Sequence, residues 1–154
     1  MRSPMLAILL AACAPGTTRP AFRPFPQALT AVLRTTPDRV TGEISGWLAA
    51  EGLRVEWASP RDGYLETAWF DTQTRQSVER GSGPGNPGTV KIRCWADPDR
   101  PGMTQLTVEP VYRPIDDPSR PERDLELVVP LGQDGHRLAE RLIAALRDKF
   151  GGPP

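Results

Sequence analysis

The chain has 154 residues, of which 38% are hydrophobic, and this is enough for one modest apolar core but not for two. Its 19 basic residues balance its 19 acidic ones, so neither a basic field typical of nucleic-acid binding nor the acidic excess of a polyanion mimic is present. We therefore expect a single folded domain that does not bind nucleic acid.

The first residues have the pattern of an export signal. Arg2 supplies a positive charge, and an unbroken apolar run over residues 5–10 follows it directly. This run is about half as long as the roughly 20 residues that a membrane-spanning helix needs. A buried N-terminal helix is the alternative interpretation, and the shortness of the leader is also consistent with a start codon further upstream.

The apolar run ends in a leucine, two alanines and Cys13, a sequence that resembles the lipobox of bacterial lipoproteins. The resemblance implies a signal peptide over residues 1–12 and a diacylglyceryl group on the Cys13 thiol. It also implies an outer-membrane location facing the periplasm, because Ala14 replaces the aspartate that retains many lipoproteins in the inner membrane. Each buried methylene contributes about 0.8 kcal/mol to anchoring, so several acyl chains hold a protein durably.

Residues 13–26 carry Pro15, Pro20, Pro24 and Pro26, a composition that resists helix formation and favours an extended backbone. Together with the lipid-bearing cysteine, this stretch predicts a proline-rich tether. The tether connects the membrane to a single domain over residues 27–151.

The domain begins with one predicted strand and one predicted helix. Residues 28–34 are compatible with a strand or a short helix, and we expect a strand. Thr36 and Pro37 have the features of a helix start, and Gly52 is placed to end the helix in a left-handed conformation. The apolar stripe of this helix comprises Val40, Ile44, Trp47 and Leu48.

Alternating stretches then predict strands of an antiparallel sheet. These stretches are 53–57, 64–70, 90–96 and 104–113, with a short extended segment at 125–129. Residues 59–63 and 97–102 predict turns, and the glycine-rich stretch 81–88 predicts a loop. Because that loop lacks the Lys-Ser/Thr ending of a P-loop and leads into a strand, we do not expect it to bind phosphate.

A second amphipathic helix closes the chain. Asp134 is placed to cap it and Gly151 to end it, and His136 falls in its first turn, where we expect a surface position. Its apolar stripe comprises Leu138, Leu142, Leu146 and Phe150. The order of elements predicts an α+β fold, with an antiparallel sheet of about four to five strands and two helices packed on one face, a helix-grip arrangement.

No pattern in the sequence predicts catalysis or a cofactor. His136 is the sole histidine and has no imidazole or thiol partner at the spacing of a triad or a zinc site. Cys94 alternates with apolar residues, so we expect it in the core. Asp116 and Asp117 lack the ligand series of a calcium loop, and we expect a solvated loop there. Converging carboxylates remain an open alternative, although so small a domain rarely builds a substrate cleft.

The order of these elements resembles the BamC (NlpB) lipoproteins of the β-barrel assembly machinery. In that family a helix-grip domain follows a lipidated cysteine, and a helix ending in glycine precedes a strand and then a Gly-aromatic-hydrophobic strand. The corresponding pieces here are Cys13, the tether, residues 47–57 and residues 63–70, and the likeness covers about residues 36–150. The family has two domains and a longer N-terminal segment. The resemblance implies a link to outer-membrane protein assembly.

Aromatic residues indicate a protein-interaction or scaffolding module. Leu65 and Trp69 are expected to face the core. Their neighbours Tyr64, Glu66 and Phe70 then point outward, and one helix layer cannot bury rings on both faces, although a loop folded over the second face would give the same pattern. The candidate interaction surface comprises Tyr64, Phe70 and Trp95. The alternative function is binding of a small apolar ligand in a cavity between helix and sheet.

Overall fold

The computed structural model describes residues 19–79 and 87–152, so Cys13, the signal peptide and most of the loop at 81–88 lie outside the described residues. The predicted α+β class is confirmed, with two α-helices and an antiparallel sheet. Seven strands are present in the described part, more than the four or five expected. The elements are β1 (Leu29–Leu33), α1 (Pro37–Ala50), β2 (Val55–Ser59), β3 (Tyr64–Thr67), β4 (Phe70–Asp71), β5 (Thr89–Pro98), β6 (Thr104–Tyr112), the 3-10 helix η1 (Glu122–Leu125), β7 (Leu127–Val128) and α2 (Asp134–Phe150).

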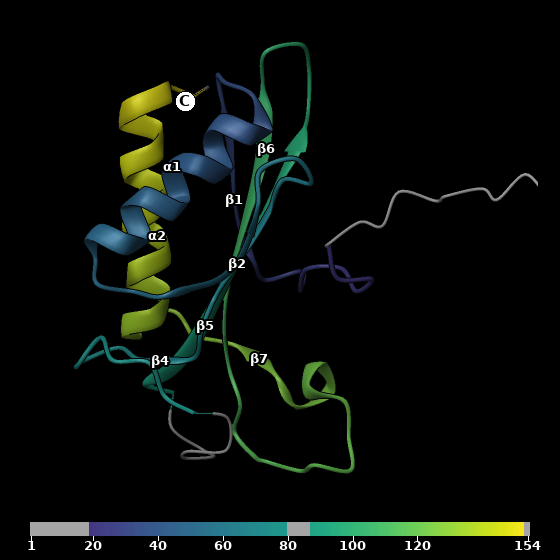
Figure 1. Ribbon diagram of the computed structural model, residues 1–154, viewed down its shortest axis with the longest axis vertical. Helices are drawn as coiled ribbons and strands as arrows, with labels where there is room; N and C mark the ends of the chain where they lie inside the picture. The colour runs from purple at the N-terminus through teal and green to yellow at the C-terminus, as the bar shows by residue number, and fades with distance from the viewer. Residues whose placement is uncertain (1–18, 80–86, 153–154) are drawn as a thin grey trace, which may run out of the picture.

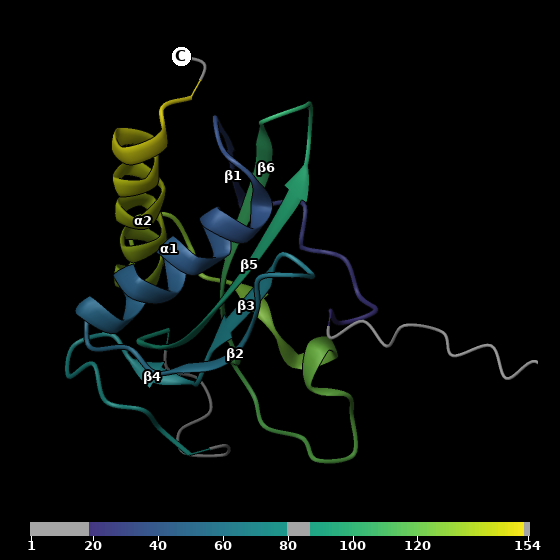
Figure 2. The same cartoon turned by 45° about the horizontal axis from the view of Figure 1, so that its top comes forward.

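The sheet has the order β1-β6-β5-β3-β2, and the short strands β4 and β7 pair with β5 and β6. Both helices cover the same face of the sheet, and the segment before β1 lies on the other face together with η1 (Figures 1 and 2). Neither helix in the described part of the chain is long and apolar enough to cross a membrane.

The two helices begin and end close to the predicted residues. Thr36 precedes α1 with an extended backbone, Pro37 opens the helix, and Gly52 adopts a φ of 78° just after it. Asp134 is the first residue of α2 and not its cap, which is Gln133. Proline at the first helical position and glycine with positive φ beyond the last turn are the terminators that the sequence pattern indicated.

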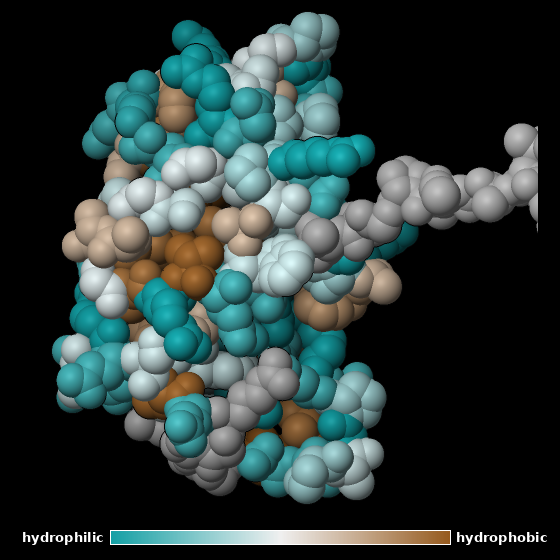
Figure 3. Space-filling view, in the orientation of Figure 1, coloured by the Kyte–Doolittle hydropathy of each residue, from teal (hydrophilic) through white to brown (hydrophobic). Residues whose placement is uncertain are grey.

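The apolar core lies between the helices and one face of the sheet, and Figure 3 shows hydrophobic residues in the angle that the helices make with the sheet. Cys94 belongs to this core, as predicted, and burial raises the pKa of its thiol well above the usual range, with a smaller contribution from the charge of Glu109. The core residues that are no more than 1% exposed include Val40, Ile44, Leu48, Ile92, Leu106, Val108, Leu138, Leu142 and Leu146.

His136 is buried at 6% exposure, so the prediction of a surface position is wrong. The cause is the close approach of α2 to the sheet at Gly135, where an added Cβ would lie 2.8 Å from a methyl group of Val90. This contact presses the first turn of α2 against β5. The Nδ1 atom of His136 lies 3.6 Å from a carboxylate oxygen of Glu140.

An interruption between β3 and β4 changes which side chains face the core. Ala68 and Trp69 belong to neither strand, so Leu65 and Phe70, five positions apart, both lie in the apolar core. In an uninterrupted strand, residues an odd number of positions apart point to opposite faces. Trp69 instead stacks against Lys91, whose Nζ lies 5.3 Å from its ring centroid. The predicted orientations of Trp69 and Phe70 are therefore wrong.

The turn between β2 and β3 is fixed by Gly63. Its φ is 61°, and its carbonyl oxygen accepts a hydrogen bond of 2.7 Å from the backbone N–H of Ala96 on β5. A Cβ at this position would lie 2.1 Å from the carbonyl oxygen of Ala96. The turn thus lies so close to β5 that a residue with a Cβ atom does not fit at position 63 unless the backbone shifts.

We expect Gly63→Ala to lower the free energy of unfolding by about 2–4 kcal/mol, the sum of left-handed strain and a forced backbone shift. Gly102→Ala is the matched control, because Gly102 has a φ of 74° and a Cβ added there would meet no other atom within 4 Å. Its expected loss is about 1 kcal/mol, from strain alone. Urea denaturation measures the free energy of unfolding of both variants. Equal losses of stability would show that the close approach to Ala96 does not destabilise Gly63→Ala.

Candidate functional site

A cluster of charged side chains lies on the sheet face that the helices do not cover. Strand pairing places Glu66 of β3 directly beside Arg93 of β5, and Arg93 directly beside Glu109 of β6. Arg123 of η1 and Glu126, just before β7, complete the set. Directly opposed charges of opposite sign stabilise a strand pair. We call Glu66, Arg93, Glu109, Arg123 and Glu126 the ionic cluster.

Two bidentate arginine–carboxylate pairs form the centre of the ionic cluster. Arg93 donates to the two carboxylate oxygens of Glu126 at 2.5 and 2.6 Å. Arg123 donates to the two oxygens of Glu109 at 2.7 and 2.9 Å. The side chains of Glu109 and Glu126 are fully buried, and that of Arg93 is 4% exposed. Burial of a charge is costly unless the charge is paired and hydrogen-bonded. Here one arginine neutralises the charge of each buried carboxylate and also donates a hydrogen bond to each of its oxygens.

Glu66 lies at the outer side of the ionic cluster. It accepts a hydrogen bond of 3.3 Å from Nε of Arg93 and one of 2.7 Å from the hydroxyl of Tyr64. Burial, and then the hydrogen bond to Glu66, raises the pKa of the Tyr64 hydroxyl well above its usual range. Burial works to lower the pKa of Arg93, but the hydrogen bonds and charge of Glu126 outweigh it and hold that pKa above its usual value. Tyr64 is thus a fixed hydrogen-bond donor and Arg93 a fixed cation.

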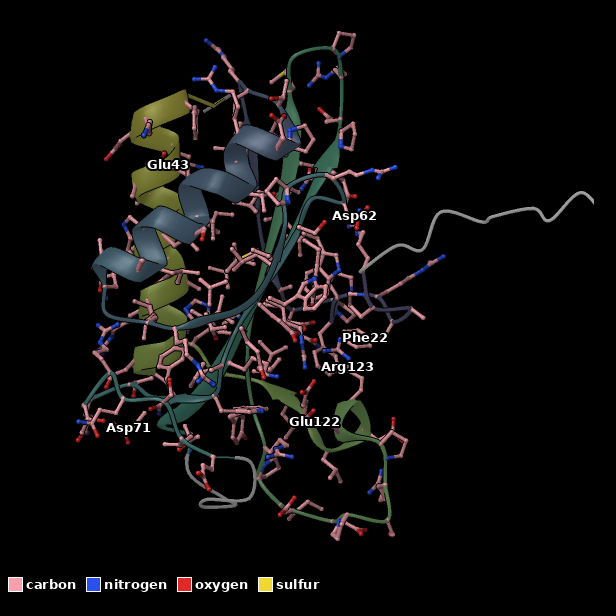
Figure 4. All side chains as sticks on the ribbon, viewed as in Figure 1. Phe22, Glu43, Asp62, Asp71, Glu122 and Arg123 are labelled. Carbon is pink, nitrogen blue, oxygen red and sulfur yellow. The ribbon has the colours of Figure 1, made fainter. Side chains whose placement is uncertain are left out.

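Residues 19–26, which we call the strap, run across the ionic cluster. The backbone N–H of Phe25 donates to Glu109 at 2.6 Å, and Arg123 donates to the carbonyl oxygen of Arg23 at 2.8 Å. The guanidinium carbon of Arg123 lies 3.6 Å from the ring centroid of Phe25 and 4.4 Å from that of Phe22. Figure 4 shows Phe22 and Arg123 close together on the side of the sheet away from the helices. Residues 19–26 are therefore part of the folded domain, and the predicted tether over 13–26 extends too far.

The candidate interaction surface of Tyr64, Phe70 and Trp95 is not exposed. Their exposures are 2%, 1% and 3%, so the prediction of an exposed aromatic patch is wrong. Tyr64 and Trp95 do lie on the face away from the helices, with ring centroids 5.4 Å apart, and Phe22 of the strap packs edge-on against Trp95 at 6.4 Å. The strap thus covers the rings that the sequence pattern left unburied, while Phe70 belongs to the apolar core.

A groove opens beside the strap. Trp57 of β2 is its most exposed aromatic residue at 47%, and its volume is about 430 Å³. Among its charged residues, Lys91 lies 3.7 Å from Glu56, and Glu122 accepts a hydrogen bond of 3.0 Å from the indole N–H of Trp69. The groove is lined by Pro20, Phe22, Trp57, Tyr64, Glu66, Lys91, Arg93 and Glu122. Its walls therefore combine aromatic rings with charged side chains that already form ion pairs or hydrogen bonds with neighbouring residues.

The predicted solvated loop around Asp116 and Asp117 is confirmed. Asp116 is exposed and lies 3.7 Å from Arg113, and Asp117 accepts hydrogen bonds from the backbone and hydroxyl of Ser119. The Ser119 hydroxyl and then its backbone N–H lower the pKa of Asp117. No cluster of three or more metal-ligating side chains occurs in residues 19–79 and 87–152.

We expect Arg93→Met to lower the free energy of unfolding by about 3–5 kcal/mol, because Glu126 stays buried without its bidentate partner. The double variant Arg93→Met/Glu126→Leu is expected to lose less, since it removes both charges. Arg137→Met is the control: its pair with Asp134 spans 3.6 Å between side chains that are 63% and 55% exposed. Such an exposed pair contributes at most about 1 kcal/mol.

Urea denaturation of the three variants measures these differences. If Arg93→Met cost no more than Arg137→Met, the ionic cluster would be open to water in solution.

No model of a known protein family matches the chain, and no curated protein is significantly similar to it. The resemblance to the BamC lipoproteins therefore stays a prediction from the order of elements. The described residues form a groove beside the strap, and its lining includes half-exposed Trp57 together with Glu66 and Arg93 of the ionic cluster.

Proposed function

We propose that the protein is a non-catalytic cell-envelope lipoprotein, anchored through Cys13 in the outer membrane and facing the periplasm, whose domain binds another envelope protein. The observation that carries the binding role is the groove beside the strap, where half-exposed Trp57 faces charges that are already paired. The proposed link to outer-membrane protein assembly rests on the BamC resemblance.

The composition of the groove suits a protein partner. Interface anchors are enriched in tryptophan, and half-exposed Trp57 lines the groove. Tyr64 and Arg93 are buried and hydrogen-bonded behind it, so the groove keeps its shape when a partner arrives. A small apolar ligand is less suitable, because it would displace water from the charged side chains in these walls and offer them no hydrogen bond in return.

The edge of the sheet offers a second means of contact next to the groove. β2 lies at one end of the strand order and pairs with β3 alone among the described strands. Glu56, Trp57 and Ala58 on this strand are exposed. An extended segment of a partner can add to such an edge through main-chain hydrogen bonds while its side chains enter an adjoining pocket. Trp57 lies at the junction of the two surfaces.

The groove also lies near the proposed anchor along the chain. Pro20 lines the groove and is seven residues from Cys13 in the sequence. A fully extended chain spans about 3.3–3.6 Å per residue, so the groove lies at most about 25 Å from the lipid-bearing residue. A partner that reaches the groove is thus held close to the membrane surface.

The charged groups of the site favour binding over catalysis. Glu109 and Glu126 are each held by bidentate arginine contacts, and Arg93 is held as a fixed cation. The thiol of Cys94 is buried in the core and its pKa is raised, which disfavours the thiolate. The two carboxylates are thus held in place by bidentate ion pairs, and the thiol is removed from solvent.

Site-specific crosslinking in living cells tests the proposal. We expect a photoreactive benzoylphenylalanine in place of Trp57 to give a crosslinked adduct with one envelope protein in the outer-membrane fraction. The same residue in place of Leu131 is the control, because Leu131 is 82% exposed and lies in the turn before α2. Cys13→Ser is expected to move the protein out of the membrane fraction and to reduce the adduct at least tenfold.

Equal adducts from positions 57 and 131 would contradict the groove as the binding site. An unchanged membrane fraction after Cys13→Ser would contradict the lipid anchor, independently of the crosslinking result.

A further inference from the structure

The strap is held on the sheet by side chains of the domain and not by strand pairing. β1, which begins at Leu29, is the first strand of the described chain, so residues 19–26 make no β-ladder. The main-chain hydrogen bonds and the cation–π contacts come instead from Glu109, Arg123 and Arg93, which we call the clamp. Trp95 packs against Phe22, and Asp97 forms a salt bridge with Arg19. A segment held in this way can be exchanged without breaking the sheet.

The clamp contacts main-chain atoms of the strap. Glu109 accepts the backbone N–H of Phe25, and Arg123 donates to the backbone carbonyl of Arg23. Both groups exist in any peptide, provided that the residue at the position of Phe25 is not proline. The hydrogen-bonding part of this recognition is therefore independent of side-chain identity.

Two aromatic rings supply the selectivity of the clamp. Arg123 lies 3.6 Å from the ring centroid of Phe25 and 4.4 Å from that of Phe22, and Arg93 lies 5.1 Å from the ring centroid of Phe22. Arginine attracts an aromatic face most strongly when it is desolvated, and these guanidinium groups are 17% and 4% exposed at the side chain. The clamp thus holds two aromatic residues three positions apart.

The ion pairs within the clamp do not involve the strap. Arg123 donates two hydrogen bonds to Glu109, and Arg93 donates two to Glu126, and no atom of residues 19–26 takes part in these four bonds. Water can replace both hydrogen bonds that the clamp makes to the strap backbone. Ordering eight residues of chain also costs conformational entropy, which offsets part of what the strap gains by docking. Exchange of the strap for another peptide would therefore leave the ion pairs of the clamp intact.

We infer that the clamp is a recognition site for an extended protein segment of the pattern aromatic-x-x-aromatic, and that the strap occupies it as a tethered ligand. In this structure the clamp binds one such sequence, Phe22-Arg23-Pro24-Phe25 of the strap. The inference rests on the proposed protein-binding role and names the chemistry of the partner. A partner that presents such a segment displaces the strap, and so frees the wall of the adjoining groove that Pro20 and Phe22 form.

Peptide binding in vitro tests the inference on the mature chain with Cys13→Ser. The probe is a fluorescein-labelled peptide with the sequence of residues 17–28, followed by fluorescence anisotropy. We expect Phe22→Ala/Phe25→Ala protein to bind it at least tenfold more tightly than protein with its own strap, because the weakened strap no longer competes. Two further peptides serve as controls, one with both phenylalanines changed to alanine and one with N-methylphenylalanine at the position of Phe25. Each is expected to bind at least tenfold more weakly than the probe.

A second measurement uses the strap in place and does not depend on the double variant folding. An environment-sensitive dye on Ala21→Cys, at an exposed position of the strap, is expected to change its emission when excess unlabelled probe peptide is added. The di-alanine peptide is expected to leave the emission unchanged. Absence of any change, or equal effects of the three peptides, would overturn the inference and show the strap to be a permanent part of the fold.

The outcome is separable from that of the crosslinking experiment. Peptide binding without a position-57 adduct would support the clamp and remove the groove as the partner site. An adduct without peptide binding would support the groove and overturn the clamp as a recognition site.

Discussion

The ion pairs around Arg93 hold together the half of the molecule that neither α1 nor α2 covers. A sheet has two faces, and the helices exclude water from one of them. On the other face Arg93 joins β3, β5 and the segment before β7 through Glu66 and Glu126. A buried charge is tolerated where its partners are complete, and the contacts of Arg93 therefore fix the segment before β7 relative to the sheet. The pair of Arg123 with Glu109 does the same for η1.

The same pairing explains why the groove has a defined shape. Its aromatic residues lie next to charges that cannot reorient without leaving a buried partner unsatisfied. Tyr64 is held by Glu66 on one side and packs against Trp95 on the other. The site is therefore rigid on the side of the sheet and adjustable on the side of the strap, where backbone hydrogen bonds and ring stacking are the main contacts.

The helices and the long strands could be predicted from the sequence because their signals are local. Proline and glycine mark the ends of α1, and strict alternation places Cys94 in the core. The covering of the second sheet face could not be predicted in this way. Alternation shows that Glu66 and Arg93 point away from the helices, but it does not show what lies above them, and the strap reaches Glu109 from 84 residues away in the sequence. Opposite charges at outward positions of adjacent strands were the available signal.

Two errors have a more local origin. The interruption at Ala68 and Trp69 has no turn residue to mark it, so the pattern of the preceding strand was extended through it to Phe70. The burial of His136 depends on how closely α2 approaches β5, which is a property of packing between elements and has no signature within the helix itself.

The path of the chain from the sheet toward its N-terminus determines where mechanical load enters the domain. A pull on residues before Arg19 reaches the salt bridge of that residue with Asp97 and the contacts of Phe25 before it reaches β1. Side-chain contacts of this kind are individually weaker than a strand ladder, so we expect them to break first and to release eight residues, about 26 Å of extended chain, before the core unfolds. With the proposed anchor at Cys13, the strap would be the first part of the domain to detach when the chain is pulled from the membrane.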